Sequence, residues 1–225
     1  MARLPLSKVD AASLQQDRNR ALERLGVSRE TLARLDLFVQ LLIKWQTTIN
    51  LVAPSTLPII WSRHVLDSAQ IHELGPAHEK WLDLGSGSGF PGLVIAILLA
   101  DRPSREIHLV ESDSRKASFL REAARVTRAP AIIHGSRAEA VLPNLAGRFG
   151  AVTARALAPL VELLKMAEPL LTTGAEGFFP KGQAVESELE SASTLFAFEV
   201  ELVQSRTDKH GRIVMIRNLR RRRAP

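Results

Sequence analysis

The chain of 225 residues carries 30 lysines and arginines against 24 aspartates and glutamates, with 45% hydrophobic residues and no cysteine. This length suits one large domain or a domain with an extension. The absence of cysteine excludes disulfides and thiolate chemistry, and it fits the reducing cytoplasm, where we expect the protein. No apolar run of about 18 residues is present, so no membrane span is expected. The net charge of +6, much of it from Arg217 and Arg220–Arg223, favours a polyanionic partner.

Residues 1–75 are predicted to form a helical extension. Apolar residues recur at helical spacing in three segments, at about 14–25, 32–49 and 59–74. Ser28 is well placed to cap the second helix, and Pro54 and Pro58 interrupt the pattern before the third. A first strand is expected only after these helices, beginning near Trp81.

Residues 81–92 combine a short apolar strand with four glycines, and a second apolar run, 93–100, follows at once. Glycine is needed where the backbone takes a positive φ or approaches a ligand closely. Pro91 suits the first turn of a helix, where no N–H donor is missed. The pattern predicts a strand, a tight loop and a buried helix whose N-terminus points at the ligand of the loop.

Two ligand classes fit this loop. The spacing Gly87-x-Gly89-x-x-Gly92 matches the dinucleotide fingerprint. Asp83, however, would repel a pyrophosphate and would suit a ligand with an ammonium group, such as S-adenosylmethionine. Glu111 ends the next strand at about the distance where an acid binds the ribose hydroxyls of either ligand. The residues favour S-adenosylmethionine and leave a nicotinamide dinucleotide as the alternative.

Strands and helices alternate after the loop. Strands are expected at 106–111, 131–135, 150–154 and 176–179, helices from about 113 and over 159–171 and 185–196, and an antiparallel hairpin at 199–204 and 212–217. Repeated βαβ units predict an α/β fold with a parallel sheet and helices on both faces. We expect this domain to span residues 76–219 and a basic tail to span 220–225.

The glycine loop resembles that of the RsmG/GidB family at Asp83-x-Gly85-x-Gly87-x-Gly89-Phe90-Pro91-Gly92. Members of this family are bacterial 16S rRNA 7-methylguanosine methyltransferases. The resemblance implies a class I S-adenosylmethionine-dependent methyltransferase fold, with a seven-stranded, mostly parallel sheet and a closing antiparallel hairpin. It also implies transfer of a methyl group to N7 of a guanosine in the 530 loop of 16S rRNA, position 527 by the usual count.

Two motifs in the helical extension add to the resemblance, which runs from about residue 35 to 217. Trp45, Asn50 and Leu51 are similar to a family segment from which Gln46 and Val52 depart. The segment His64-x-x-Asp67-Ser68 is similar to a second family motif. Asp67 and Ser68 are interpreted as internal hydrogen-bonding groups, whereas His64 either packs internally or borders the substrate cleft. Trp45 and Trp61 are interpreted as core residues.

Eight residues are candidates for binding the cofactor. The resemblance implies cofactor-contact positions for Gly85, Phe90, Ala138, Glu139 and Arg155. The reasoning from the residues adds Asp83 for the ammonium, Gly87 in the loop and Glu111 for the ribose. Phe90 is expected to cover the sugar or the methionine chain, and the segment 138–139 to present backbone groups to the adenine. Ordinary loop packing is the alternative for each residue.

Arg155 and Lys181 are the candidate catalytic residues, and their role is to position groups. Both follow predicted strands, in segments that match the family's S-R-A-F/L-A and K-G motifs. Arg155 is expected to hold the cofactor carboxylate or an RNA phosphate, with a structural salt bridge as the alternative. Lys181 is expected to contact an rRNA phosphate or guanine O6, unless it is simply exposed. Guanine N7 bears no hydrogen, so its methylation needs no general base.

The expected partner is 16S rRNA or a small-subunit assembly intermediate, and the expected state is a monomer without a metal or a membrane contact. No zinc-ligand spacing or P-loop occurs in the sequence. Two other functions are open: a nicotinamide-dependent dehydrogenase, and a basic RNA-binding module that has kept an inactive cofactor loop. Binding of NAD would distinguish the first, and rRNA binding that ignores the cofactor would distinguish the second.

Overall fold

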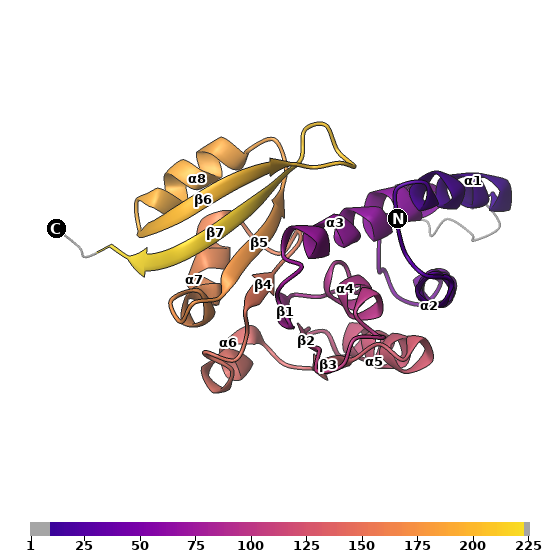
Figure 1. The fold of residues 1–225 in the computed structure, drawn as a ribbon, viewed down its shortest axis with the longest axis horizontal. Helices are drawn as coiled ribbons and strands as arrows, with labels where there is room; N and C mark the ends of the chain where they lie inside the picture. The colour runs from indigo at the N-terminus through magenta and orange to yellow at the C-terminus, as the bar shows by residue number, and fades with distance from the viewer. Residues whose placement is uncertain (1–9, 223–225) are drawn as a thin grey trace.

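A computed structural model of the chain describes residues 10–222 (Figure 1). Its centre is a seven-stranded sheet in the order β3-β2-β1-β4-β5-β7-β6. The strands are β1 (Lys80–Leu84), β2 (Glu106–Val110), β3 (Ala131–His134), β4 (Ala151–Thr153), β5 (Glu176–Lys181), β6 (Phe196–Gln204) and β7 (Arg212–Arg221). Strands β1 to β5 pair in parallel, and β7 is antiparallel to both β5 and β6. The predicted parallel sheet with a closing hairpin is therefore confirmed.

Helices cover the two faces of the sheet and create a core on each side. The first core joins β1 and β2 to α1 (Ala11–Leu22), α2 (Arg29–Gln46), α3 (Asp67–Leu74), α4 (Gly92–Leu98) and α5 (Ser114–Thr127). The second core joins β4, β5 and β7 to α6 (Ala138–Val141), the 3₁₀ turn η4 (Leu142–Asn144), α7 (Leu160–Leu171) and α8 (Val185–Ser193). This layering leaves the carboxyl ends of the parallel strands for ligands.

The N-terminal helices pack on the sheet domain through buried side chains. Trp61 is 1% exposed within the first core, and Trp45 packs edge-on against Phe119 with ring centroids 5.7 Å apart. Trp61 is thus a core residue, as the sequence indicated, and Trp45 is partly buried against the same core. Ser28 caps α2 as predicted, since its side chain accepts a hydrogen bond from the backbone N–H of Thr31.

The third predicted helix, 59–74, is divided into two parts, and a 3₁₀ helix precedes it. A 3₁₀ helix, η2 (Pro54–Ile59), precedes a π-helical segment, η3 (Trp61–Leu66), and α3 begins at Asp67. Proline cannot donate to the preceding turn, which explains why regular helix begins only after Pro58. The carboxylate of Asp17 on α1 then accepts hydrogen bonds from the backbone N–H groups of Trp61 and Ser62, at 2.9 and 3.2 Å.

The C-terminal hairpin is longer than the sequence pattern indicated. Strand β6 begins at Phe196, which was expected to lie in a helix, and β7 continues to Arg221. Arg220 and Arg221 are consequently paired strand residues, whereas Arg223 lies outside the described part of the chain. Arg221 also forms an ion pair with Glu168 on α7. Within residues 10–222, no helix combines the length and the apolar character that crossing a membrane requires.

Candidate functional site

The glycine loop lies between the end of β1 and the start of α4. Gly85 and Gly87 have φ angles of +63° and +54°, which glycine adopts without steric cost. A Cβ atom on Gly92 would lie 2.6 Å from Asp83 Oδ2, so only glycine lets this carboxylate reach the first turn of α4. Pro91 is the residue immediately before α4, one position earlier than expected.

Asp83 is a buried carboxylate with one oxygen that has no hydrogen-bond partner among the described residues. Asp83 is 1% exposed, and its Oδ2 atom accepts a hydrogen bond from Gly92 N at 3.1 Å. Its Oδ1 atom has no hydrogen-bond partner among the described residues. Burial raises the pKa of Asp83 to about 7, because the charged form is poorly solvated. A cationic ligand group would satisfy Oδ1 and restore the carboxylate form.

Glu111 connects the glycine loop to the end of β2. Its Oε2 atom accepts a hydrogen bond from Gly87 N at 2.8 Å, and Oε1 accepts one from Asp113 N at 2.7 Å. Each carboxylate oxygen can accept a second hydrogen bond, so both remain able to bind ligand hydroxyl groups. Glu111 therefore has a structural role that is compatible with the predicted one.

Two neighbouring cavities surround this loop. The first, about 440 Å³, is lined by Gly85, Gly87, Phe90, Glu111, Lys116 and Arg155, among others, and we call it the glycine-loop cavity. The second, about 270 Å³, is lined by Gly85, Ser136, Ala138, Glu139, Leu157 and Met166, among others. Both cavities share Gly85 and Leu157. The structure thus brings the candidate cofactor residues into two adjoining spaces, with Asp83 buried beneath the loop.

Phe90 lies between two other functional candidates. The Cζ atom of Arg155 lies 5.1 Å from the centre of the Phe90 ring, and the ring of His64 stacks on Phe90 with centroids 4.9 Å apart. Phe38 packs on Phe90 as well, with centroids 5.2 Å apart. Phe90 is only 3% exposed, so its main observed role is to support Arg155 and His64 at the cavity wall.

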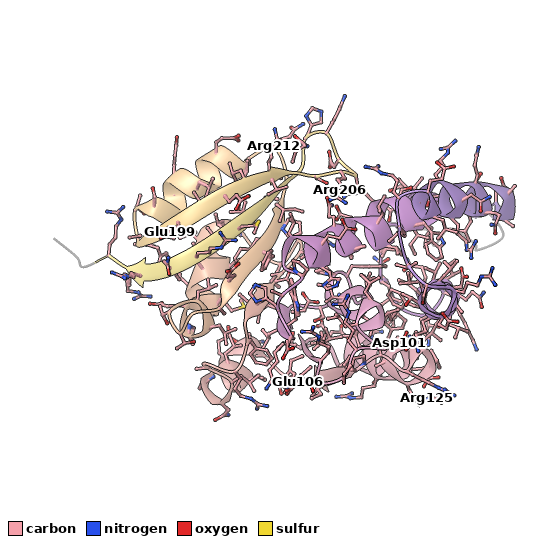
Figure 2. All side chains as sticks on the ribbon, viewed as in Figure 1. Asp101, Glu106, Arg125, Glu199, Arg206 and Arg212 are labelled. Carbon is pink, nitrogen blue, oxygen red and sulfur yellow. The ribbon has the colours of Figure 1, made fainter. Side chains whose placement is uncertain are left out.

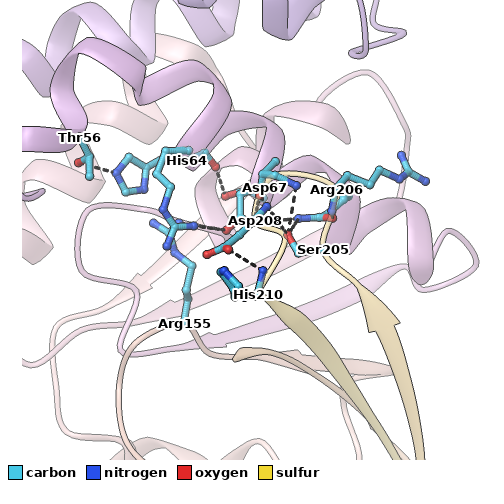
Figure 3. A network of polar contacts seen from close by, with 12 residues as sticks. Thr56, His64, Asp67, Arg155, Ser205, Arg206, Asp208 and His210 are labelled. Carbon is cyan, nitrogen blue, oxygen red and sulfur yellow. Dashed lines mark hydrogen bonds and ion pairs between the residues drawn. The ribbon is translucent and has the colours of Figure 1, made fainter. Parts of the chain in front are cut away.

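Arg155 follows β4 and is linked to the helical extension (Figure 3). Its Nη1 atom lies 3.3 Å from Asp67 Oδ2. Burial lowers the pKa of Arg155, and the nearby Asp67 carboxylate opposes this effect. Asp67 thus makes the internal contact expected of it, and so does Ser68, whose hydroxyl donates to His64 O at 2.6 Å. Arg155 combines the salt bridge that was the alternative to its predicted role with a position at the cavity wall.

Lys181 lies in a third cavity, described below, and its ammonium already has protein partners. Its Nζ atom lies 2.7 Å from Glu188 Oε2 and donates to Ala158 O at 2.8 Å. The side chain is 8% exposed. Lys181, at the end of β5, therefore connects the segment after β4 to Glu188 on α8. A contact between Lys181 and rRNA would have to compete with this ion pair.

Leu157 is a site residue that the sequence reasoning did not single out. It lines the glycine-loop cavity, the second cavity and the third cavity. A Cβ atom on Gly85 would lie 2.6 Å from Leu157 Cδ1, so the two residues are in tight contact. Its position in the segment that matches the family's S-R-A-F/L-A motif was the one available signal. No group of three His, Asp or Glu side chains suited to a metal ion occurs within residues 10–222.

Solved structures share this architecture. A putative O-methyltransferase from Klebsiella pneumoniae superposes with a TM-score of 0.60 and 13% identity over 91% of this chain and 99% of that chain. Cofactor-bound Rv0187 from MTB superposes with a TM-score of 0.57 and 12% identity over 83% and 91% of the two chains. These likenesses show the fold, which is the class I methyltransferase fold.

Sequence comparison identifies the family. The family model for rRNA small subunit methyltransferase G matches residues 31–218. Ribosomal RNA small subunit methyltransferase G of Bradyrhizobium sp. strain BTAi1 is 51% identical over 210 residues, which are 93% of this chain and 93% of that protein. The protein of the same name from Methylobacterium nodulans is 50% identical over 204 residues, 90% and 96% of the two chains. The chain therefore belongs to the rRNA small subunit methyltransferase G family.

Proposed function

We propose that this protein transfers a methyl group from S-adenosylmethionine to N7 of guanosine 527 in the 530 loop of 16S rRNA. The observation that carries the proposal is the buried Asp83, with its unpartnered Oδ1, beneath the glycine loop of a chain from this family. S-adenosylmethionine has an ammonium group and no phosphate. In addition, Asp83 already accepts the N–H of Gly92 at the start of α4, where a dinucleotide would bind its pyrophosphate.

The chain's own residues divide the work of binding and orientation. Asp83 would bind the ammonium of the cofactor, Glu111 its ribose hydroxyls, and the segment 138–139 its adenine. S-adenosylmethionine supplies a methyl group on a positively charged sulfur. Arg155 would hold the cofactor carboxylate with one part of its guanidinium while Asp67 fixes the other part. The residues would thus fix the cofactor from four sides and leave the acceptor base as the remaining reactant.

The direct test uses purified protein, S-adenosylmethionine labelled in its methyl group, and small ribosomal subunits from cells that lack the gene for this protein. We expect one 7-methylguanosine per 16S rRNA, mapped by chain cleavage at the modified base. Subunits from cells that have the gene are the control and should accept no label at this position. Label on another atom or another nucleotide, or no label on any rRNA substrate, would contradict the proposal.

Replacement of His64 by alanine should preserve most of the single-turnover methylation rate. Burial lowers the pKa of His64 to about 3, so the ring is neutral throughout the usual pH range and is a weak base. Its Nε2 atom lies 2.9 Å from Thr56 Oγ1, an internal contact. Since N7 has a free lone pair, the chemical step requires alignment of the reacting atoms at about 3–3.5 Å and no base. The rate should accordingly show no ionisation near pH 6.5.

A His64→Ala variant that binds cofactor and rRNA normally but loses several hundredfold in rate would make His64 catalytic. The measurement is a rapid-quench single turnover at saturating concentrations, from pH 5.5 to 8.5. Thr56→Val is the matched control, because it removes the hydroxyl partner of the ring and leaves the imidazole in place.

A further inference from the structure

A third cavity, of about 440 Å³, lies beside the glycine-loop cavity. Its walls come from the segment after β4, from the end of β5, from the β6–β7 loop (205–211) and from the start of β7, and include Leu157, Pro180, Lys181, Asp208, Arg212 and Ile213. The two cavities share the residues Arg63, Arg155, Ala156 and Leu157. Figure 2 shows Arg206 and Arg212 at the end of the hairpin that lies next to α3. A ligand in this third cavity would therefore adjoin a ligand in the glycine-loop cavity.

The β6–β7 loop is fixed to the helical extension by specific hydrogen bonds (Figure 3). The hydroxyl of Thr207 donates to Asp67 Oδ1 at 2.6 Å, and Arg206 N donates to Gln70 Oε1 at 2.9 Å. Gly211 N donates to Asp208 O at 3.0 Å and closes the loop. Polar groups carried by this loop are consequently held in defined positions at the cavity wall.

Three carboxylates line this cavity, and they differ in what they already bind. Asp67 pairs with Arg155 and accepts from Thr207 and Gln70, and Glu188 pairs with Lys181. Asp208, by contrast, accepts only the backbone N–H of His210, through Oδ1 at 2.9 Å. Within residues 10–222 its Oδ2 has no hydrogen-bond partner, and no cation lies within ion-pair distance. Asp208 is therefore the carboxylate that can still receive donors from a ligand.

We propose that this cavity receives the acceptor guanine and that Asp208 selects it by accepting the hydrogens on N1 and N2. This inference rests on the proposed function, which supplies the base. A carboxylate can accept two parallel N–H donors, and guanine presents such a pair on its Watson–Crick edge. Adenine presents an unprotonated N1 there, whose lone pair would face the carboxylate. Apolar residues such as Leu157, Pro180 and Ile213 suit the flat faces of a base.

The position of Asp208 also orients the base correctly. Asp208 lines the third cavity and not the glycine-loop cavity, whereas Arg155 and Leu157 line both. In guanine, N7 lies on the side of the ring system remote from N1 and N2. A base whose N1–N2 edge faces Asp208 therefore directs N7 towards the wall that the two cavities share. This arrangement brings the atom to be methylated next to the proposed cofactor site.

The test compares 16S rRNA carrying either guanosine or inosine at the methylated position, because inosine keeps N7 and N1–H but lacks the 2-amino group. With the wild-type protein, we expect kcat/KM to fall about tenfold or more for inosine, as for other lost bonds to a charged group. In Asp208→Asn, an amide N–H₂ faces the donors of guanine. Its kcat/KM for guanosine should fall by a similar factor, and its preference over inosine should shrink towards unity. Asp208→Glu should keep part of the preference.

Glu186→Gln is the matched control, because it removes one negative charge from an exposed position on α8. It should match the wild type with both substrates. The affinity for S-adenosylhomocysteine should be unchanged in Asp208→Asn. An intrinsic difference in N7 reactivity between the two bases affects every variant equally, so the readout is the change in their ratio.

Two failures are distinguishable. If methyl transfer to guanosine proceeds and the guanosine-to-inosine ratio is the same in wild type and Asp208→Asn, the role of Asp208 is overturned while the proposed function stands. If no guanosine of 16S rRNA is methylated by the wild-type protein, the proposed function fails and this inference fails with it.

Discussion

Asp83→Asn should bind S-adenosylhomocysteine about tenfold or more weakly than the wild type at pH 8, because it replaces a buried charged acceptor with a neutral amide. The unpartnered Oδ1 is the atom that would receive the ammonium. Asparagine would either offer a weaker oxygen or turn an N–H₂ group towards the cation. Isothermal titration calorimetry measures this difference directly, and equal affinities would remove Asp83 from the cofactor site.

The same variant should lose a pH dependence that the wild type has. In the free protein Asp83 has a pKa of about 7, whereas ammonium binding requires the carboxylate. Wild-type affinity should therefore fall by up to about tenfold for each pH unit below about 7, until the pKa of the complex is reached. The affinity of Asp83→Asn should lack this slope. Titrations in buffers of different ionisation enthalpy would also detect a proton released on binding to the wild type alone.

Stability should change in the opposite direction to binding. The folded-state pKa of Asp83, about 7, lies above its ordinary value of 3.8, so the folded chain holds the proton more tightly. The resulting contribution to stability is complete below pH 3.8 and is lost as the pH rises to about 7. Asp83→Asn avoids this loss, so its free energy of unfolding at pH 8 should exceed that of the wild type by up to about 4 kcal/mol. The gain should diminish towards pH 4 in urea titrations without ligand.

Asp17→Asn is the matched control for this variant. Asp17 is 5% exposed, but its oxygens accept three hydrogen bonds, from Trp61 N and from the backbone and side chain of Ser62. Its replacement should destabilise the protein and leave cofactor affinity unchanged. If both variants are destabilised equally at pH 8, burial does not raise the pKa of Asp83 in the folded protein as inferred.

Gly85→Val should produce the largest structural defect in the loop. At a φ of +63° a β-branched side chain costs about 1–3 kcal/mol, and its Cβ would lie 2.6 Å from Leu157 Cδ1. Both cavities that Gly85 lines would be narrowed, so binding of S-adenosylhomocysteine should be lost as well. Urea unfolding and calorimetry measure the two effects separately.

Gly87→Val separates backbone strain from the collision with Leu157. Gly87 has a similar φ of +54°, but a Cβ atom there would meet nothing closer than Gly85 O at 3.7 Å. Its loss of stability should therefore be smaller than that of Gly85→Val. Adding Leu157→Ala should recover stability in the Gly85 variant and not in the Gly87 variant. Equal recovery in both backgrounds, or in neither, would contradict the tight contact between Gly85 and Leu157.

Much of the fold was predictable because its signals are local. Apolar strands followed by helical patterns indicated the parallel sheet, and Asp83 stood out because it directly precedes the glycines. The division of residues 59–74 into a π segment and an α segment was missed, because the Asp17 carboxylate that binds Trp61 and Ser62 comes from a distant helix. A sequence pattern carries no record of such a contact.

The limits of prediction are similar in the site. Lys181 was recognised by its motif, but its ion pair with Glu188 depends on where α8 packs, beside α7 and β6. The contact between Arg155 and Asp67 joins residues that are 88 positions apart. Asp208 had no motif at all, and only the closure of the hairpin against α3 brings it to the cavity wall. Site residues were thus predictable where one segment of the chain contains the whole motif. Their hydrogen-bond and ion-pair partners, which come from distant segments, were not.

Leu157 belongs to the walls of all three cavities, and this has a thermodynamic consequence. Because Leu157 lines several cavities, a ligand that displaces its side chain in one cavity changes the volume available to a ligand in the next. Binding in one cavity is thereby linked to binding in the others. Such linkage is reciprocal: the factor by which one ligand alters the affinity of a second equals the factor by which the second alters the affinity of the first. Cooperativity between the two reactants can therefore arise at one leucine, without any rearrangement of the sheet.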